Sequence, residues 1–368
     1  MRQLRNWAKI GRVYKINHKS YLFSIFPLIY TVMGQSRVVN ATEMYNKYDD
    51  YGFPVPRHYD YELHKKYLSK IKRRQQEWNE LNDRNKYKRG CRLKRRIRKG
   101  IPWNERSTTW MILSGAQALK NKSTRSYEEL KAVINNTDVI KQLEKDVLRL
   151  FRENIFFMKE GVMQKRVFNI CGAFANQNAE INYCQGLDRI AALLLLSTKD
   201  EEISFWLYKA LIENILPNYF GGGLSGLLTE IAVFLDLLRS KEPSLYQHFN
   251  DLGLNLHSKL SHWFLCSYSG ILPAETVLRI WDCLFYEGSV VLMRVALTLI
   301  RMHKNQLLQV NNAEELVKCL QDIEQHPQVY DCNYFIKLIY NISGSLTNKQ
   351  LIKLRIKHIN AIEEMCKY

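Results

Sequence analysis

Two polar side chains stand out as candidates for chemistry, and the first is Arg149 in the segment Leu143-Glu144-Lys145-Asp146-Val147-Leu148-Arg149. On a helix, Leu143, Asp146 and Arg149 share one face because they are spaced three residues apart. Asp146 can therefore pair with Arg149 and restrict the directions in which the guanidinium points. An isolated Asp–Arg pair at this spacing is more often a surface salt bridge that contributes about 0.2–0.5 kcal/mol. The segment alone does not establish a site.

The second candidate is Gln185 in the segment Asn182-Tyr183-Cys184-Gln185-Gly186, which leads into an apolar stretch. Gly186 permits a close approach of backbone or ligand. Gln185 then lies at the mouth of a buried helix, where its amide can both donate and accept hydrogen bonds. The alternative interpretation is a polar residue that only caps this helix.

Other kinds of site find little support. Eight cysteines are scattered singly without a CxxC pair, and the nine histidines do not cluster with them. This usage is typical of a reducing cytosol and indicates no zinc site. The sequence also lacks the phosphate-binding loop G-x-x-x-x-G-K-[ST] and the nucleophile motif G-x-S-x-G. We expect no metal and no cofactor held by the chain itself, and we disfavour a hydrolase.

The elements that must position these residues are helices, because helical periodicity is sustained from Ile101 to about Asn341. Apolar stripes at i, i+3, i+4 and i+7 recur within residues 231–238, 277–284 and 292–300. Residues 187–196 are apolar nearly all round after Arg189, which is typical of a central core helix. We find no convincing strand alternation and no internal repeat. The sequence predicts an all-α domain of roughly 240 residues.

The net charge of +18 is unevenly distributed, with a balance of +17 in residues 1–100 and +1 in the remainder. Such asymmetry indicates an N-terminal arm that meets an acidic partner, either a membrane surface or a polyanion. The basic run Arg84–Lys99 is interpreted as a solvated linker or arm. The apolar run Tyr21–Met33 is shorter than the roughly 20 residues of a membrane span. A short buried helix and a membrane-associated segment both remain open for it.

Four motifs occur in the order that characterises one family. They are Arg98-Lys99-Gly100-Ile101-Pro102 with Arg106 and Trp110 (R-x-G-x-P…R…W), Leu143 to Arg149 (I-x-x-D-x-x-R, with Leu for Ile), Tyr183-Cys184-Gln185-Gly186 (Y-x-Q-G), and Leu278-Arg279-Ile280-Trp281-Asp282 with Glu287-Gly288 (R-x-W-D…E-G). In this order they resemble the TBC domain of Rab GTPase-activating proteins, over roughly Lys99 to Asn341. The upstream segment Tyr51-Gly52-Phe53 and Tyr61 is similar to one branch of that family.

The resemblance implies an all-α, TBC-domain-like multi-helical fold with two helical subdomains. We expect an N-terminal region with a basic linker over residues 1–98, the Rab-GAP TBC domain over 99–341, and a C-terminal helix over 342–368. A protein of this kind is not expected to be an enzyme itself. It is a GTPase activator that completes the active site of a partner Rab-family small GTPase in its GTP form.

The resemblance also implies roles for the candidate residues. Arg149 corresponds to the arginine finger and Gln185 to the glutamine finger that replaces the GTPase's own glutamine. Asp146 is expected to orient Arg149, Tyr183 to fix its loop and Gly186 to permit the loop's shape. GTP and Mg²⁺ then belong to the partner. One departure is that Leu150-Phe151-Arg152 replaces the Thr and Pro with which the family often continues the arginine motif.

Three alternatives stay open at this point. The first is a catalytically weak TBC-fold scaffold that binds a GTPase or another trafficking partner without accelerating hydrolysis. The second is nucleic-acid binding through Tyr87–Lys99, which we disfavour because Tyr87 is the only stacking residue in that run. The third, compatible with the main hypothesis, is a peripheral contact of the basic run with acidic membrane. We expect a cytoplasmic protein.

Overall fold

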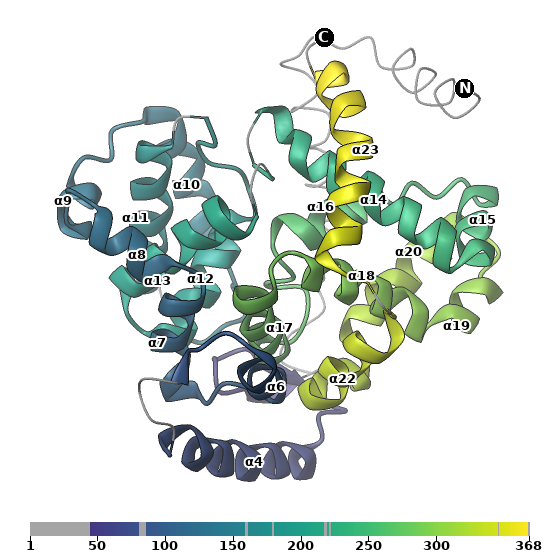
Figure 1. Cartoon of the computed structure of the whole chain (residues 1–368), viewed down its shortest axis with the longest axis horizontal. Helices are drawn as coiled ribbons and strands as arrows, with labels where there is room; N and C mark the ends of the chain where they lie inside the picture. The colour runs from purple at the N-terminus through teal and green to yellow at the C-terminus, as the bar shows by residue number, and fades with distance from the viewer. Residues whose placement is uncertain are drawn as a thin grey trace.

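The computed structural model describes residues 45–80, 86–158, 161–178, 180–216, 219–220, 222–344 and 346–366. The apolar run Tyr21–Met33 and the beginning of the basic run at Arg84 lie outside these residues. The described chain is almost entirely helical (Figure 1), which confirms the predicted all-α class. None of the helices in this part has the length and apolar character that crossing a membrane requires.

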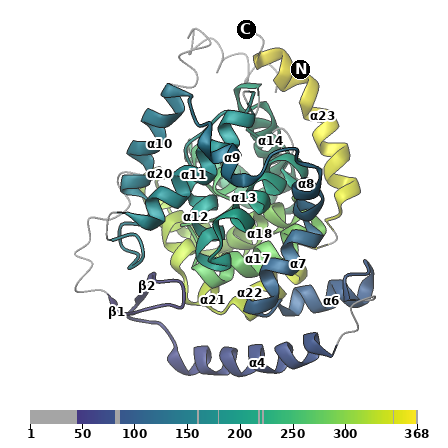
Figure 2. The same ribbon diagram turned by 90° about the vertical axis from the view of Figure 1, so that its left-hand side faces the viewer.

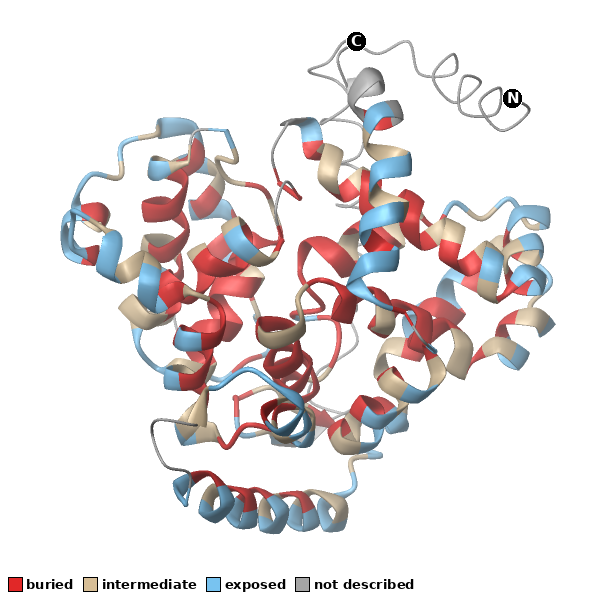
Figure 3. Cartoon of the chain, in the orientation of Figure 1, coloured by how far each residue is buried: buried red, intermediate tan, exposed pale blue. Residues whose placement is uncertain are grey.

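The N-terminal part runs along one side of the molecule. Its elements are β1 (Tyr45–Tyr48), β2 (Pro54–Pro56), α4 (Tyr61–Asn79) and α6 (Cys91–Lys99). The two strands pair antiparallel, and the sequence does not reveal them because strands of four and three residues are too short for readable alternation. Helix α4 turns one buried face, which includes Ile71 and Trp78, toward the body of the protein and exposes the other (Figure 3).

Helix α6 differs from the expected solvated linker. Leu93 and Ile97, four residues apart and therefore on one helical face, are buried against α17 (Ala274–Glu287). Arg98 binds Glu287 through two hydrogen bonds of 2.7 Å, and Lys94 lies 3.2 Å from the same carboxylate. The basic composition of this segment hides a narrow apolar stripe that is enough to dock the helix.

Two groups of helices follow and form the two predicted subdomains, on opposite sides of Figure 1. The first group consists of α7 (Trp103–Leu113), α8 (Ala116–Lys122), α9 (Tyr127–Ala132), α10 (Thr137–Arg149), α11 (Val162–Gln177), α12 (Leu187–Thr198), α13 (Glu201–Ala210) and the π-helical turn η1 (Leu211–Ile215). Residues 190–196 of α12 are all buried, so the prediction of a central core helix is confirmed.

The second group contains the three predicted apolar stripes, on α14, α17 and α18. Its elements are η2 (Gly222–Leu224), α14 (Ser225–Lys241), α15 (Pro243–Asp251), α16 (His257–Leu265), α17, α18 (Val290–Met302), α19 (Lys304–Gln309), α20 (Ala313–Asp322), η3 (Ile323–Gln325), α21 (Pro327–Tyr330) and α22 (Cys332–Ile342). The final helix, α23 (Asn348–Cys366), packs along α14 (Figures 1 and 2). Arg355 of α23 donates to the buried carboxylate of Glu230 on α14.

A buried polar network joins the first and last of the four sequence motifs. The fully buried carboxylate of Asp282 accepts hydrogen bonds from Arg106 at 3.3 Å, from Trp110 at 2.9 Å and from Arg279 at 3.1 Å. The backbone N–H of Ile101 donates to the same carboxylate at 3.1 Å. Because a buried charge is stable only when it is paired and hydrogen-bonded, these motif residues hold α7, α17 and the segment before α7 together.

Candidate functional site

Arg149 is the last residue of α10. Asn136 caps the other end of this helix by accepting a hydrogen bond from the backbone N–H of Val139 at 3.2 Å. An apolar face that includes the fully buried Leu143 packs α10 on α11. The backbone becomes extended at Leu150, with φ −69° and ψ 125°, and ends the helix directly after Arg149. The Arg149 side chain is 30% exposed.

The carboxylate of Asp146 is the anchor for Arg149 and is itself fully buried. One oxygen accepts from the Arg149 guanidinium and from Gln142 Nε2, at 3.1 Å for the glutamine. The other accepts from Tyr183 OH at 2.9 Å and from the same Gln142 nitrogen at 3.1 Å. The Asp146–Arg149 pair is therefore not an exposed salt bridge. Its acid is sealed from water and satisfied on both oxygens.

The loop that contains Gln185 is held by residues on either side of it. On one side, the Tyr183 hydroxyl donates to Asp146. Burial raises the pKa of the Tyr183 phenol well above its usual value, and the nearby charges of Asp188 and Asp146 add to this rise. Gly186 has φ +107°, and a Cβ there would lie 3.1 Å from Cys266 Sγ. Its N–H donates to Asp188 Oδ1 at 3.0 Å. Only glycine fits this turn without strain.

A second buried carboxylate, Asp188, lies beneath this loop at the start of α12. Burial raises its pKa, the adjacent Arg189 opposes that rise, and the charge of Asp146 adds to it. The Arg189 guanidinium donates to the Gly270 carbonyl at 3.4 Å and lies 6.0 Å from the centre of the Phe151 ring. The carboxylates of Asp146 and Asp188 and the guanidiniums of Arg149 and Arg189 thus lie in the same part of the site.

Arg149 and Gln185, thirty-six residues apart in the chain, line the same groove. The groove has a volume of about 1320 Å³. Its walls include residues 49–51 and 53–55, the first half of α4, the loop 149–154, the segment 270–276 before and within α17, and parts of residues 318–334. Both candidate residues thus border one groove, although Arg149 is partly exposed and the Gln185 Oε1 atom is buried. Asp146 links the helix of Arg149 to the loop of Gln185.

This arrangement offers a permanently charged fork of donors and an amide that can donate and accept. It suits an anionic group that enters the groove from outside. Within the described residues, no group of three or more His, Cys, Asp or Glu side chains is arranged to hold a metal ion.

Gln142 and Asp188 are site residues that the motif positions do not reveal. Gln142 lies one helical turn before Asp146, a spacing at which side chains on a helix meet. Asp188 is an acid inside a stretch that is otherwise apolar, and buried acids in apolar helices need partners. An acid within an apolar stretch is a pattern in the sequence that could have identified Asp188.

The Leu150–Phe151 departure from the family pattern has a structural account. Leu150 is 3% exposed and belongs to the core. Phe151 has φ +44°, and its ring makes edge contacts with Phe53 at 4.9 Å and Phe157 at 5.7 Å between centroids. These two residues pack the loop after Arg149 into the body of the protein.

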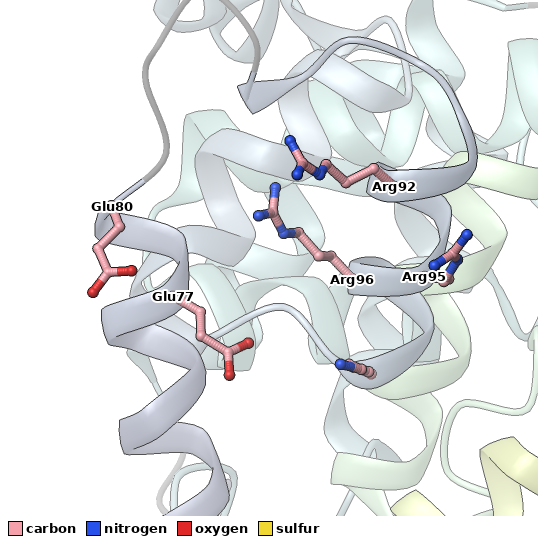
Figure 4. Close-up of a pocket in the computed structure, with 6 residues that line it drawn as sticks. Glu77, Glu80, Arg92, Arg95 and Arg96 are labelled. Atoms are coloured by element: carbon pink, nitrogen blue, oxygen red, sulfur yellow. The ribbon is translucent and has the colours of Figure 1, made fainter.

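A separate small pocket of about 370 Å³ lies between α4 and α6. Figure 4 shows Arg92 and Arg96 of α6 extending toward the end of α4, where Glu77 and the residue after the helix, Glu80, lie. Arg92 and Arg95 are exposed. This pocket is lined by four basic residues of α6 and two acidic residues, and it belongs to other elements than the groove that Arg149 and Gln185 line.

The fold, the four motifs and the groove define a class of protein. Residues 104–308 match the Rab-GTPase-TBC domain, and the chain belongs to this family. The solved TBC domain of a Chlamydomonas flagellar RabGAP is 27% identical and has a TM-score of 0.71, covering 80% of this chain and 99% of that one. The YPT/Rab-GAP domain of Gyp1p shares the fold at 16% identity, with a TM-score of 0.59 over 80% of this chain and 99% of that domain.

The branch indicated by the upstream segment is that of the growth hormone-regulated TBC proteins. Growth hormone-regulated TBC protein 1-A of Danio rerio is 38% identical over 86% of this chain and 90% of its own length. The human growth hormone-regulated TBC protein 1 is 36% identical over 83% of this chain and 93% of its own length. The predicted similarity to this branch is confirmed.

Proposed function

We propose that this protein stimulates GTP hydrolysis by a Rab-family small GTPase in its GTP form, with Arg149 and Gln185 inserted into the partner's active site. One observation carries the proposal. The two side chains line one groove, and the buried carboxylate of Asp146 holds both Arg149 and Tyr183 of the Gln185 loop. The GTP and Mg²⁺ belong to the GTPase.

Arg149 suits the charge that develops during phosphoryl transfer. Hydrolysis by the GTPase alone is slow because the transferring phosphoryl oxygens lack sufficient stabilisation. An arginine supplied in trans accelerates such a reaction by about 10³–10⁵, or roughly 4–7 kcal/mol of barrier. The guanidinium stays charged and can contact two phosphate oxygens at once. Pairing with Asp146 reduces the conformations that it must lose on binding.

Gln185 suits the attacking water. Its amide can accept from the water and donate to the γ-phosphate simultaneously, and so hold the nucleophile in line. Tyr183 ties this loop to Asp146, while the positive φ of Gly186 gives the loop its shape. Both act as positioning residues.

The test is single-turnover GTP hydrolysis, followed by phosphate release, across a panel of GTP-loaded Rab proteins. Arg149→Ala and Gln185→Ala are each expected to lower the stimulated rate at least about tenfold, out of the acceleration of about 10³–10⁵ that an arginine finger supplies. Arg125→Ala and Gln117→Ala are matched controls, because both residues are exposed and lie outside the groove. The controls are expected to keep the full rate.

Two outcomes would count against the proposal. Equal hydrolysis rates with and without this protein, together with measurable binding to a Rab, would favour the scaffold alternative. Full stimulation by both alanine variants would remove the assigned roles of Arg149 and Gln185 even if the protein were an activator.

We further propose that the protein is cytoplasmic and makes a peripheral contact with acidic membrane through α6. The outward side chains of Arg92, Arg95 and Lys99 are exposed, while the opposite face of the helix is docked on α17. Each basic residue near an anionic surface contributes about 1 kcal/mol. Such a contact would bring the groove near a membrane-bound Rab.

Liposome flotation with and without acidic lipid tests this contact. Replacing Arg92, Arg95 and Lys99 with alanine is expected to reduce flotation on acidic vesicles. A variant with Lys122, Arg125 and Lys141 replaced carries the same change of charge at other exposed positions and is the control. Binding that does not depend on acidic lipid, or that both variants lose equally, would contradict the assignment to α6.

A further inference from the structure

A short turn at Asp49–Phe53, outside the segment that matches the family, lies against the loop that follows Arg149. Asp49 shapes this turn. Its carboxylate accepts from the backbone N–H groups of Tyr51 and Phe53, both at 2.9 Å, and its own N–H donates to the Phe53 carbonyl at 2.7 Å. The turn is therefore a preformed unit and not an extended tail.

One side of the turn is hydrogen-bonded to Glu275 and Arg106, which belong to α17 and α7. Tyr51 is 8% exposed, and its hydroxyl donates to Glu275 at 2.5 Å. Arg106 donates to the same hydroxyl at 2.9 Å and to the Glu275 carboxylate at 2.7 and 3.0 Å. The turn thus has a rigid base on α7 and α17.

The other side of the turn is bonded to the loop after Arg149. The Tyr51 carbonyl accepts from the buried Asn154 side chain at 2.8 Å, and the Gly52 carbonyl accepts from the Ile155 N–H at 3.0 Å. The Phe53 ring meets the edge of Phe151 at 4.9 Å. Two hydrogen bonds and one aromatic contact therefore clamp a loop that starts directly after Arg149.

Gly52 shows how closely the two segments approach. It has φ +81°, and a Cβ at this position would lie 2.7 Å from Phe156 Cδ2 and 2.8 Å from Ile155 Cγ1. Any side chain here would force the loop and the turn apart. The loop has a backbone hydrogen bond of its own, from the Asn154 N–H to the Phe151 carbonyl at 2.8 Å, but Phe151 has a positive φ that surrounding packing must maintain.

From these contacts we infer that the Asp49–Phe53 turn positions the loop after Arg149, and through it the Arg149 guanidinium, for the stimulated reaction. The inference rests on the proposed function. Phe53 and Gly52 are positioning residues in this scheme. Displacement of about 1 Å at a reacting group can lower a rate as much as about 10²-fold, so loss of the clamp acts on kcat.

The experiment measures stimulated hydrolysis on the Rab that responds best, with Phe53→Ala as the test variant. We expect kcat to fall about tenfold while KM for the GTPase stays within about twofold. Phe53→Tyr keeps the ring contact and is expected to restore the rate. Tyr61→Ala removes an aromatic side chain that is 40% exposed and lies outside the groove, and is expected to have no effect.

A double-mutant comparison shows whether Phe53 acts through Arg149. In the Arg149→Ala background, Phe53→Ala is expected to cause no further loss, because the residue that it positions is absent. Multiplied losses, or an unchanged kcat in the single variant, would overturn the inference while leaving the proposed function intact. Failure of the unmodified protein to stimulate any Rab would overturn both.

Hydrogen exchange supplies a readout that does not depend on activity. The Ile155 amide donates to the Gly52 carbonyl, so its exchange is expected to accelerate in Phe53→Ala and in Gly52→Ala relative to Tyr61→Ala. Equal protection of this amide in all variants would show that the turn does not hold the loop, and would overturn the inference even if a variant lost activity through general destabilisation.

Discussion

Replacing Asp146 with asparagine tests the central feature of the site, which is one buried acid that accepts hydrogen bonds from Arg149 and from Tyr183 of the Gln185 loop. The substitution preserves shape but removes the charge and one acceptor. The amide oxygen can still face Arg149, which only donates, and the amide nitrogen can face the Tyr183 hydroxyl, which can rotate and accept. Gln142 then loses one of its two contacts. The geometry can survive, so the cost is mainly electrostatic.

The magnitude follows from the hydrogen bonds that change character. A bond to a charged group contributes about 1.5–3 kcal/mol, and a neutral one about 0.5–1.5 kcal/mol. The bond with Tyr183 and the bond from Gln142 to the remaining oxygen become neutral, the Arg149 bond loses the charge of its acceptor, and the second Gln142 bond is lost. Asp146→Asn is therefore expected to cost at least about 2 kcal/mol of unfolding free energy. Asp146→Ala leaves buried donors without an acceptor and opens a cavity, so it is expected to cost about 3–5 kcal/mol.

The assay combines urea unfolding with stimulated GTP hydrolysis. Asp146→Asn is expected to lower the stimulated rate about tenfold or more, since the guanidinium is no longer held by an opposite charge. Asp138→Asn, at an exposed position in the first turn of the same helix, is the control. An Asp146→Asn protein with full stimulation would refute the orienting role, provided that Arg149→Ala is inactive. Unchanged stability would refute the electrostatic account of the buried pair.

Three further predictions concern other parts of the molecule. Gly186→Ala is expected to cost about 1–3 kcal/mol of unfolding free energy, because a residue with φ +107° would place its Cβ 3.1 Å from Cys266 Sγ; equal urea midpoints for the two proteins would contradict this. Asp282→Asn is expected to cost about 3–5 kcal/mol, because Arg106 and Arg279 lose their shared buried counter-charge; a loss below that of the Asp138→Asn control would be inconsistent with a paired network. Burial raises the pKa of Asp49 from 3.8 to about 7, so the folded state binds the proton more tightly and the unfolding free energy falls as pH rises between those values, by at most about 1.4 kcal/mol per pH unit. Asp49→Asn is expected to flatten this dependence in unfolding curves at pH 5 and pH 7.5, and an unchanged slope would assign it to other groups.

Periodicity predicted the helices whose packing is local in sequence. The all-round apolar stretch of α12 and the stripe of α17 were readable because most of their residues are buried. Helix α6 was misread as a solvated linker, because only Leu93 and Ile97 of its nine residues are buried and the cations dominate its composition. The short hairpin β1–β2 carries no readable period at all.

The sequence predicted which residues form the candidate site but not their burial or their contacts. The family motifs, and not periodicity, brought Arg149 and Gln185 together as a hypothesis. The spacing of Asp146 and Arg149 predicted that the two could pair, but not that the acid would be buried. The acid accepts a hydrogen bond at 2.9 Å from the hydroxyl of Tyr183, which is thirty-seven residues away in sequence. Contacts of this kind depend on the tertiary fold, which local patterns do not specify.

The ties at both ends of the matched segment have a practical consequence for recombinant work. A fragment cut to residues 104–308 would lack Tyr51 and Tyr67, whose hydroxyls donate to Glu275. It would also lack Arg355, whose guanidinium donates to Glu230. Apolar surface beneath α4, α6 and α23 would become accessible to water. Such a fragment is expected to be less soluble than one that begins before residue 49 and extends through α23.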